Sequence, residues 1–252
     1  HNRVNINVEN KRERKIRMSI ETLKDEVLAA NLDLVTKNLV ISTWGNVSGY
    51  DGETGVMVIK ASGVPYDKMT KEHMVTVDLD GNVIDSPYSP STDTWTHIEL
   101  YRAWKDKGIR GIVHTHSLNA TMWAQLGQDI PVYGTTHCDY FNGDIPCTRL
   151  MTGEEIGTDY ERNTGKVILE RMEALDPVRM NAVLVRSHGP FVWGTSPSAA
   201  VLNSQVLDYV ANMAYMNYTM TGGQCGRVQK ELLETHQNRK FGPGAYYGQK
   251  NH

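Results

Sequence analysis

Cysteine is scarce in this 252-residue sequence: there are three, Cys138, Cys147 and Cys225, and no C-x-x-C pair. An odd number of cysteines without pairing motifs excludes a disulfide framework and favours a reducing, cytoplasmic location. No apolar run approaches the roughly 18 residues of a membrane span. The net charge of −3 provides no basic surface for nucleic acid or an anionic membrane. The sequence therefore predicts neither a nucleic-acid partner nor a membrane partner.

The rest of the composition is that of an ordinary globular domain, with 40% hydrophobic and 22% charged residues. The length suits one domain with a full core. Residues 1–17 are polar, become basic towards their end and lack the apolar segment of a secretory signal. We expect residues 1–17 to be an N-terminal extension, disordered or foreign to the natural chain, and residues 18–252 to form a single domain.

The hydrophobic pattern predicts both helices and strands. Apolar residues at three- and four-residue steps predict a helix from Ser19, its N-cap, to about Leu34. Strands are expected at Leu39–Trp44, Gly55–Lys60 and Met74–Asp78, with hairpin-like turns between them. Further helices are expected at Thr94–Lys107, Asn119–Leu126, Val167–Leu175 and from Pro197 to about Gly222. Because βαβ repeats are absent, the class is α/β or α+β with a mostly antiparallel sheet.

Two apolar runs each end in histidine. The first is a buried strand, Ile109–Val113, followed by His114 and His116. Residues two apart on a strand share a face, so these imidazoles project together, roughly 6 to 7 Å apart. They are either two hydrogen-bonded structural histidines or a metal-binding pair. The second run, Asn181–Val185, leads to His188 and a Gly-Pro break, and three imidazoles leave an open position on zinc.

Three short segments of small and polar residues adjoin strands, at Gly45–Asn46, Ser62–Gly63 and Ser91–Thr92. Glycine permits close backbone approach, and hydroxyls with free N–H groups can surround a phosphate. Lys60 adds positive charge. Each segment alone is equally an ordinary turn. Because the Walker sequence and G-x-G-x-x-G are both absent, a small phosphorylated metabolite is favoured over a nucleotide.

Several polar residues allow two interpretations. Asp93 is either the N-cap of the following helix or a carboxylate beside the metal. Asp139 is either a loop residue or a general acid/base, and His97 and His137 fit a structural role. The C-terminal Gly242–Gln249 either frays or docks on another surface.

Seven motifs in order carry a family resemblance. They are Thr43–Ser48 (TWGNVS), Lys60–Gly63 (KASG), Ser91–His97 (STDTWTH), His114–His116 (HTH), His137–Tyr140 (HCDY), Ser187–Pro190 (SHGP) and Ala245–Gln249 (AYYGQ). Together they closely resemble the L-ribulose-5-phosphate 4-epimerases of the class II aldolase/epimerase family, from about Met18 to Gln249.

The resemblance implies a three-layer α/β/α fold around a mainly antiparallel sheet, assembled as a homotetramer with active sites between subunits. It implies zinc, one ion per subunit, bound by His114, His116 and His188 with Asp93 close by. It assigns phosphate contacts to Asn46, Lys60, Ser62, Gly63, Ser91 and Thr92. It makes Asp139 and Tyr247 the acid/base pair, Tyr247 reaching in from the neighbouring subunit, and it adds His236 to the active site.

The implied reaction is the zinc-dependent epimerisation of L-ribulose 5-phosphate to D-xylulose 5-phosphate. It proceeds by retro-aldol cleavage of C3–C4, rotation of the aldehyde and re-addition. Family aldolases usually carry glutamate where Asp93 stands, so the shorter carboxylate is epimerase-like. Thr92 and Trp95 replace the usual serine and proline.

Three alternatives remain. The chain could be an aldolase for L-fuculose or L-rhamnulose 1-phosphate, an epimerase for L-xylulose 5-phosphate, or a non-catalytic module like the adducins. The three histidines argue against the non-catalytic module.

Overall fold

The computed structural model describes residues 11–243, 245 and 246. A six-stranded sheet of order β3-β2-β1-β4-β6-β5 forms its centre, and every neighbouring pair is antiparallel. The strands are β1 (Asn46–Asp51), β2 (Val56–Lys60), β3 (Met74–Asp78), β4 (Gly111–His114), β5 (Ala182–Val185) and β6 (Gly189–Gly194). The helices are α1 (Lys11–Thr36), α2 (Thr94–Trp104), α3 (Leu118–Leu126), α4 (Thr135–Cys138), α5 (Gly153–Thr158), α6 (Tyr160–Met172), α7 (Pro197–Met220) and α8 (Lys230–Phe241). Three 3-10 turns complete the elements: η1 (Tyr66–Lys68), η2 (Lys71–His73) and η3 (Lys105–Lys107).

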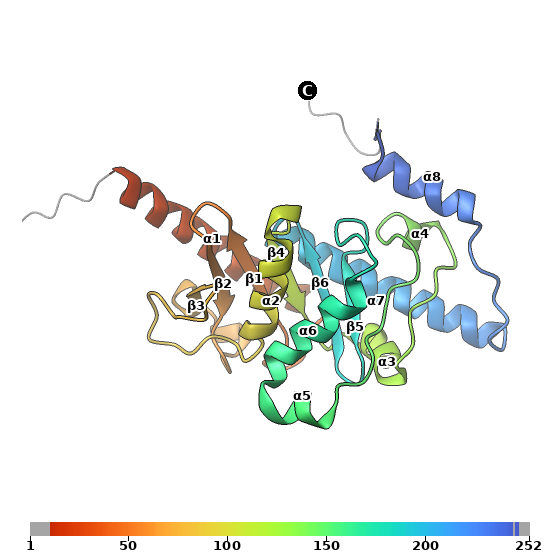
Figure 1. Cartoon of the computed structure of the whole chain (residues 1–252), viewed down its shortest axis with the longest axis horizontal. Helices are drawn as coiled ribbons and strands as arrows, with labels where there is room; N and C mark the ends of the chain where they lie inside the picture. The colour runs from red at the N-terminus through yellow and green to blue at the C-terminus, as the bar shows by residue number, and fades with distance from the viewer. Residues whose placement is uncertain (1–10, 244, 247–252) are drawn as a thin grey trace, which may run out of the picture.

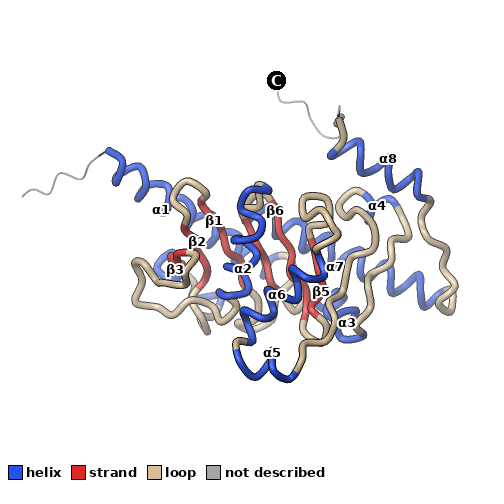
Figure 2. Tube along the Cα trace, in the orientation of Figure 1, coloured by secondary structure: helices blue, strands red, loops and turns tan. Residues whose placement is uncertain are grey.

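Helices cover both faces of the sheet (Figures 1 and 2). Side chains alternate along each strand, so Val47 and Val113 pack with α1 and α7 on one face. Ile59 and Ile112 belong to the larger core that α2 and α6 close on the other face. Trp193 on β6 is fully buried there, with its ring 4.5 Å from that of Trp104 on α2. The expected three-layer α/β/α arrangement is confirmed.

The N-terminal part differs from the prediction in two places. Leu39–Trp44 is not a strand, because left-handed backbone at Asn38 (φ 55°), Ser42 (φ 58°) and Gly45 (φ 82°) interrupts any extended run. Ser19 is not an N-cap, since α1 already begins at Lys11. Its hydroxyl instead donates to Asp51 Oδ2 at 2.7 Å. Residues 11–17, expected to be an extension, have helical backbone continuous with α1.

The register of the central strands decides which loops meet. On β1 and β4, Asn46 pairs with His114, and on β4 and β6, His114 pairs with Phe191. Gly189–Pro190 was expected to break the chain but opens β6, with Pro190 paired to Leu184. This register places the start of β1, the end of β4 and the β5–β6 turn at one edge of the sheet.

The helix α8 carries too weak a hydrophobic pattern to be predicted from sequence. It stands away from the sheet and packs against α4 (Figure 1). Gln237 is its one residue buried in the described part of the chain, and its side-chain amide donates to Cys138 O at 2.6 Å. Among the described residues, no helix has the length and apolar character needed to cross a membrane.

A tight contact between β4 and the start of α7 provides a test of this packing. A Cβ atom added at Gly111 would lie 2.3 Å from Ser196 O and 2.5 Å from Pro197 N, which are backbone atoms. We expect Gly111→Ala to lower the free energy of unfolding by about 1–3 kcal/mol, the usual cost of overpacking, in urea titrations. Gly157→Ala, where no heavy atom lies within 4 Å, is the control and should not be destabilised. Equal stability of the two variants would contradict the packing.

Candidate active site

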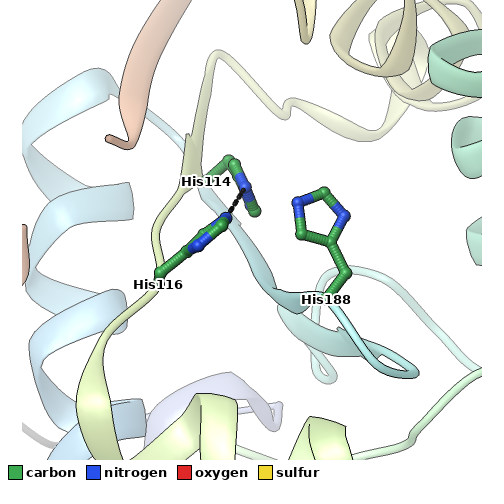
Figure 3. A group of neighbouring side chains, drawn as sticks. All are labelled: His114, His116 and His188. Atoms are coloured by element: carbon green, nitrogen blue, oxygen red, sulfur yellow. Dashed lines mark hydrogen bonds between the residues drawn. The ribbon is translucent and has the colours of Figure 1, made fainter. Parts of the chain in front are cut away.

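Three histidines, one at the end of β4 and two in the segments that follow β4 and β5, meet at this edge of the sheet (Figure 3). His114 ends β4, His116 follows two residues later, and His188 lies in the turn between β5 and β6. One ring nitrogen from each lies within 4.8 Å of the others. The Nε2 atoms of His114 and His116 are 3.1 Å apart. The three predicted imidazoles are therefore brought together.

Hydrogen bonds on the outer ring nitrogens orient two of these imidazoles. A carbonyl oxygen can only accept, so His114 Nδ1–H donates to Pro190 O at 3.0 Å, and Nε2, unprotonated, accepts from His116 Nε2. His188 turns one ring nitrogen towards the other two histidines (Figure 3), while its Nδ1 lies 3.3 Å from the hydroxyl of Tyr160. Such outer hydrogen bonds are typical of metal-binding histidines.

The donor set fits a divalent metal such as zinc. Two nitrogens bound tetrahedrally at about 2.0–2.1 Å lie roughly 3.3 Å apart, close to the His114–His116 separation. Burial lowers the pKa of His188 to about 3 and also lowers the pKa of His116. Both rings are therefore neutral near pH 7, which is the form that binds metal. Three nitrogens leave room for a substrate oxygen.

Asp93 lies beside the histidines rather than capping α2. It occupies the N-cap position but its side chain makes no capping hydrogen bond. Oδ2 instead accepts from Asn46 Nδ2 at 2.6 Å. Burial alone would raise the pKa of Asp93, but His114, His97 and this amide outweigh it and lower the pKa below its ordinary value. A charged carboxylate therefore faces the cavity at neutral pH.

All six predicted phosphate contacts share one cavity of about 380 Å³ with the histidines. The shared residues are Asn46, Lys60, Ser62, Gly63, Ser91, Thr92, Asp93, His114, His116 and His188. They meet because Ser91 N donates to Lys60 O at 2.9 Å, joining the end of β2 to the segment before α2. One pocket thus combines a metal-binding end with a hydroxyl-rich end.

Lys60 and Asn46 supply the strongest polar groups at the hydroxyl-rich end. Lys60 is only 2% exposed, and its ammonium donates to Thr43 O at 3.1 Å. Burial lowers its pKa, and the Asp93 carboxylate opposes that shift. The amide of Asn46 donates to both Asp93 and Ser91, while its buried Oδ1 has no hydrogen-bond partner among the described residues. An acceptor therefore remains for a ligand hydroxyl.

Comparison with known proteins agrees with this geometry. The model of the class II aldolase and adducin N-terminal domain family matches residues 25–215. The chain belongs to this family. Solved structures of the superfamily share its fold. Their sequence identity to this chain is low, so the likeness shows a shared fold and nothing more.

One similar structure is an L-fuculose 1-phosphate aldolase, with 23% identity, a TM-score of 0.72 and coverage of 86% of this chain and 95% of the other. A Pseudomonas syringae aldolase II superfamily protein has 16% identity, a TM-score of 0.71 and 92% coverage of both chains. YgbL from Klebsiella pneumoniae, a putative aldolase/epimerase/decarboxylase, has 21% identity, a TM-score of 0.67 and coverage of 85% and 97%.

Two predicted catalytic residues of this class II aldolase family member lie outside the cavity. Asp139, after α4, accepts from His236 Nδ1 at 2.7 Å and from Arg239 Nη2 at 2.8 and 2.9 Å, both on α8. Neither Asp139 nor His236 lines the pocket that holds the three histidines. Tyr247 lies outside the described residues.

Four residues of the cavity were missed by the sequence analysis as ligand contacts. They are Thr43, Trp44, Tyr160 and Glu161, and the ring of Trp44 lies 6.0 Å from that of His116. Tyr160 and Glu161 belong to none of the seven motifs. Nothing in their spacing marks them, since the packing of α6 on α2 and β5 brings them to the cavity.

The two histidines that were expected to be structural, His97 and His137, have structural hydrogen bonds. Buried His97 shares a 2.7 Å hydrogen bond between Nδ1 and the hydroxyl of Ser48. His137 Nε2–H donates to Gly143 O at 2.8 Å. Neither lines the cavity, in agreement with the structural interpretation.

These two histidines predict acid sensitivity. Burial lowers the pKa of His97 to about 3 and that of His137 to about 4, against 6.5 in the unfolded chain. Below pH 6.5 the unfolded state binds more protons than the folded state, so the free energy of unfolding decreases as the pH is lowered. The slope is about 1.4 kcal/mol per pH unit for each histidine, down to about pH 4. Urea titrations of the metal-free chain at about pH 7.5, 6.5 and 5.5 measure it. His137→Gln should reduce the slope, and an unchanged slope would contradict the assignment.

Proposed function

We propose that the chain is a zinc-dependent epimerase converting L-ribulose 5-phosphate to D-xylulose 5-phosphate. The observation that carries the proposal is the single cavity that holds a metal-binding histidine triad at one end and Lys60 with four hydroxyl or glycine positions at the other. A sugar phosphate presents the matching groups, with neighbouring oxygens for the metal and a phosphate for the basic end.

The phosphate end explains how a cleaved aldehyde is retained. The ammonium of Lys60 supplies charge, and the hydroxyls of Ser62, Ser91 and Thr92 supply donors. Because these groups are carried by the end of β2 and by the adjoining segments after β2 and before α2, they hold the phosphate while the rest of the fragment rotates. Retention of the fragment distinguishes an epimerase from an aldolase that releases both products.

The stereocentre requires a carbon–carbon cleavage. C4 is not adjacent to the C2 carbonyl, so simple deprotonation cannot invert it. Removal of the C4 hydroxyl proton lets the C3–C4 bond break, its electrons passing to the three-carbon fragment as C4 becomes an aldehyde. After rotation, the same bond forms on the opposite face and the proton returns to the C4 oxygen. Bound zinc would supply a Lewis acid that stabilises the developing negative charge.

The proton transfers need two groups, because the two epimers present the C4 hydroxyl on opposite sides. We assign them to Asp139 and Tyr247, with His236 holding the Asp139 carboxylate through the 2.7 Å hydrogen bond. The smaller carboxylate at Asp93, where family aldolases usually have glutamate, supports the epimerase over the aldolase. The likeness to an L-fuculose 1-phosphate aldolase keeps aldol cleavage with product release as the second candidate.

We further propose a homotetramer in which the Asp139–His236 pair of one subunit completes the cavity of its neighbour. The support is the separation of that pair from the histidine cavity of its own chain. The outer face of α7 also exposes an apolar stripe at helix-packing spacing, consisting of Leu202, Tyr209, Met213, Met216 and Met220. Three free cysteines, Cys138, Cys147 and Cys225, support a reducing, cytoplasmic location.

A product assay tests the reaction. Zinc-loaded protein is incubated with L-ribulose 5-phosphate, and D-xylulose 5-phosphate and free cleavage products are followed together. We expect xylulose phosphate without released aldehyde, and a loss of about 10²–10⁴-fold in kcat for Asp139→Asn and for Tyr247→Phe. Turnover only of deoxy-ketose 1-phosphates would select the aldolase, and turnover only of L-xylulose 5-phosphate the other epimerase. A protein that binds no metal would favour the adducin-like module.

Mixed assemblies test the shared site. Asp139→Asn and His116→Ala chains, each inactive alone, are co-expressed with different tags and the mixed species is isolated. If each site takes its histidines from one subunit and Asp139 from the next, about a quarter of the sites in random mixtures contain both intact halves. We expect activity to return to that extent. Mixed assemblies as inactive as their parents would place Asp139 and the histidines in the same subunit's site.

A further inference from the structure

The three histidines of the cavity are not held equally firmly. His114 lies within a strand whose register is set on both sides, and its Nδ1 donates to a strand carbonyl. His188 lies in a turn beside Ser187, which has a left-handed φ of 63°. A turn residue needs a side-chain contact to fix the direction of its ring. The described contact that meets its outer nitrogen comes from Tyr160.

Tyr160 is the first residue of α6 and lines the same cavity as His188. Its hydroxyl lies 3.3 Å from His188 Nδ1, and the two rings are 6.2 Å apart at a tilt of 31°. When His188 turns Nε2 towards the other histidines, Nδ1 carries the proton and donates to the tyrosine oxygen. This hydrogen bond fixes both the tautomer and the plane of the ring.

The first turn of α6 holds Tyr160 in place through contacts with α2. The hydroxyl of Thr96 donates to Glu161 O at 2.6 Å. The guanidinium of Arg162 lies 3.8 Å from the ring centre of Trp95 and 3.4 Å from the carboxylate of Glu99. Trp95 is itself packed against Gly81, where an added Cβ would lie 2.4 Å from the indole. Tyr160 therefore lies on a helix turn that is fixed by these contacts, and not on a loop.

We propose that Tyr160 is a positioning residue for the metal ligand His188, and that the contact between Arg162 and Trp95 fixes the helix turn that presents it. The inference rests on the proposed metal site but not on the proposed reaction. It also gives Trp95, which departs from the family's usual proline, a role in holding this turn. Tyr160 acts through His188, so its contribution is to the affinity and geometry of the bound metal.

Zinc affinity of purified protein tests this role. Metal-free wild type and Tyr160→Phe are titrated with zinc against a chromophoric chelator. We expect the variant to bind about 10–100-fold more weakly, the usual effect of losing an outer hydrogen bond to a ligand. The matched control is Tyr215→Phe, which lies on α7 outside the apolar stripe, is 47% exposed and should bind zinc as the wild type does. Urea titrations of the metal-free proteins should show equal stability.

Two further measurements separate positioning from a general loss of structure. In a His188→Ala background, Tyr160→Phe should have no additional effect on zinc affinity, because its target is gone. The visible absorption of the cobalt(II)-loaded protein should change in Tyr160→Phe and not in Tyr215→Phe. Zinc affinity equal to wild type in Tyr160→Phe, or an equal loss with and without His188, would overturn the inference. A wild type that binds no zinc would instead remove the proposed metal site itself.

Discussion

The antiparallel pairing of β1, β4 and β6 is the constraint on which the cavity depends. Asn46 pairs with His114, and His114 pairs with Phe191, so three segments far apart in sequence end at the same edge. A shift by one residue would turn His114 to the opposite face of the sheet. The registers are held by side chains on both faces, including Val113 against α7 and Ile112 in the larger core. The hydrophobic packing therefore also sets the geometry of the three histidines.

Burial and neighbouring charges set the ionisation states of the groups that line the cavity. The imidazole of His188 is kept neutral, with a pKa of about 3, while the Asp93 carboxylate is kept charged. Lys60 is almost fully buried, and Asp93 favours its charged form within the same pocket. Bringing these groups out of water is costly unless each has a partner. The cost is offset by hydrogen bonds between neighbours, such as those from Asn46 to Asp93 and to Ser91.

The groups proposed to transfer protons are held on a different part of the molecule. Asp139 is tied to α8 by His236 and Arg239, and α8 itself packs on α4 rather than on the sheet. The residues proposed to bind metal and phosphate thus lie at the sheet edge, whereas Asp139 follows α4 and is held by the projecting helix α8 (Figure 1). This division gives a physical reason for the proposed active site shared between subunits. A projecting helix can reach the cavity of a neighbouring subunit without disturbing the core of the subunit that carries it.

Local sequence determined much of this protein. The period-2 and helical patterns predicted β2, β3, β4 and the long α7. Short motifs marked the site residues His114, His116, His188 and Lys60. These motifs are readable because each site residue lies at or near the end of a strand whose own apolar residues predict that strand. Tertiary structure alone decided the rest. Left-handed backbone at Asn38 and Ser42 removed an expected strand, and packing of α6 on α2 brought Tyr160 to His188. These outcomes depend on contacts between residues distant in sequence, which no local pattern records.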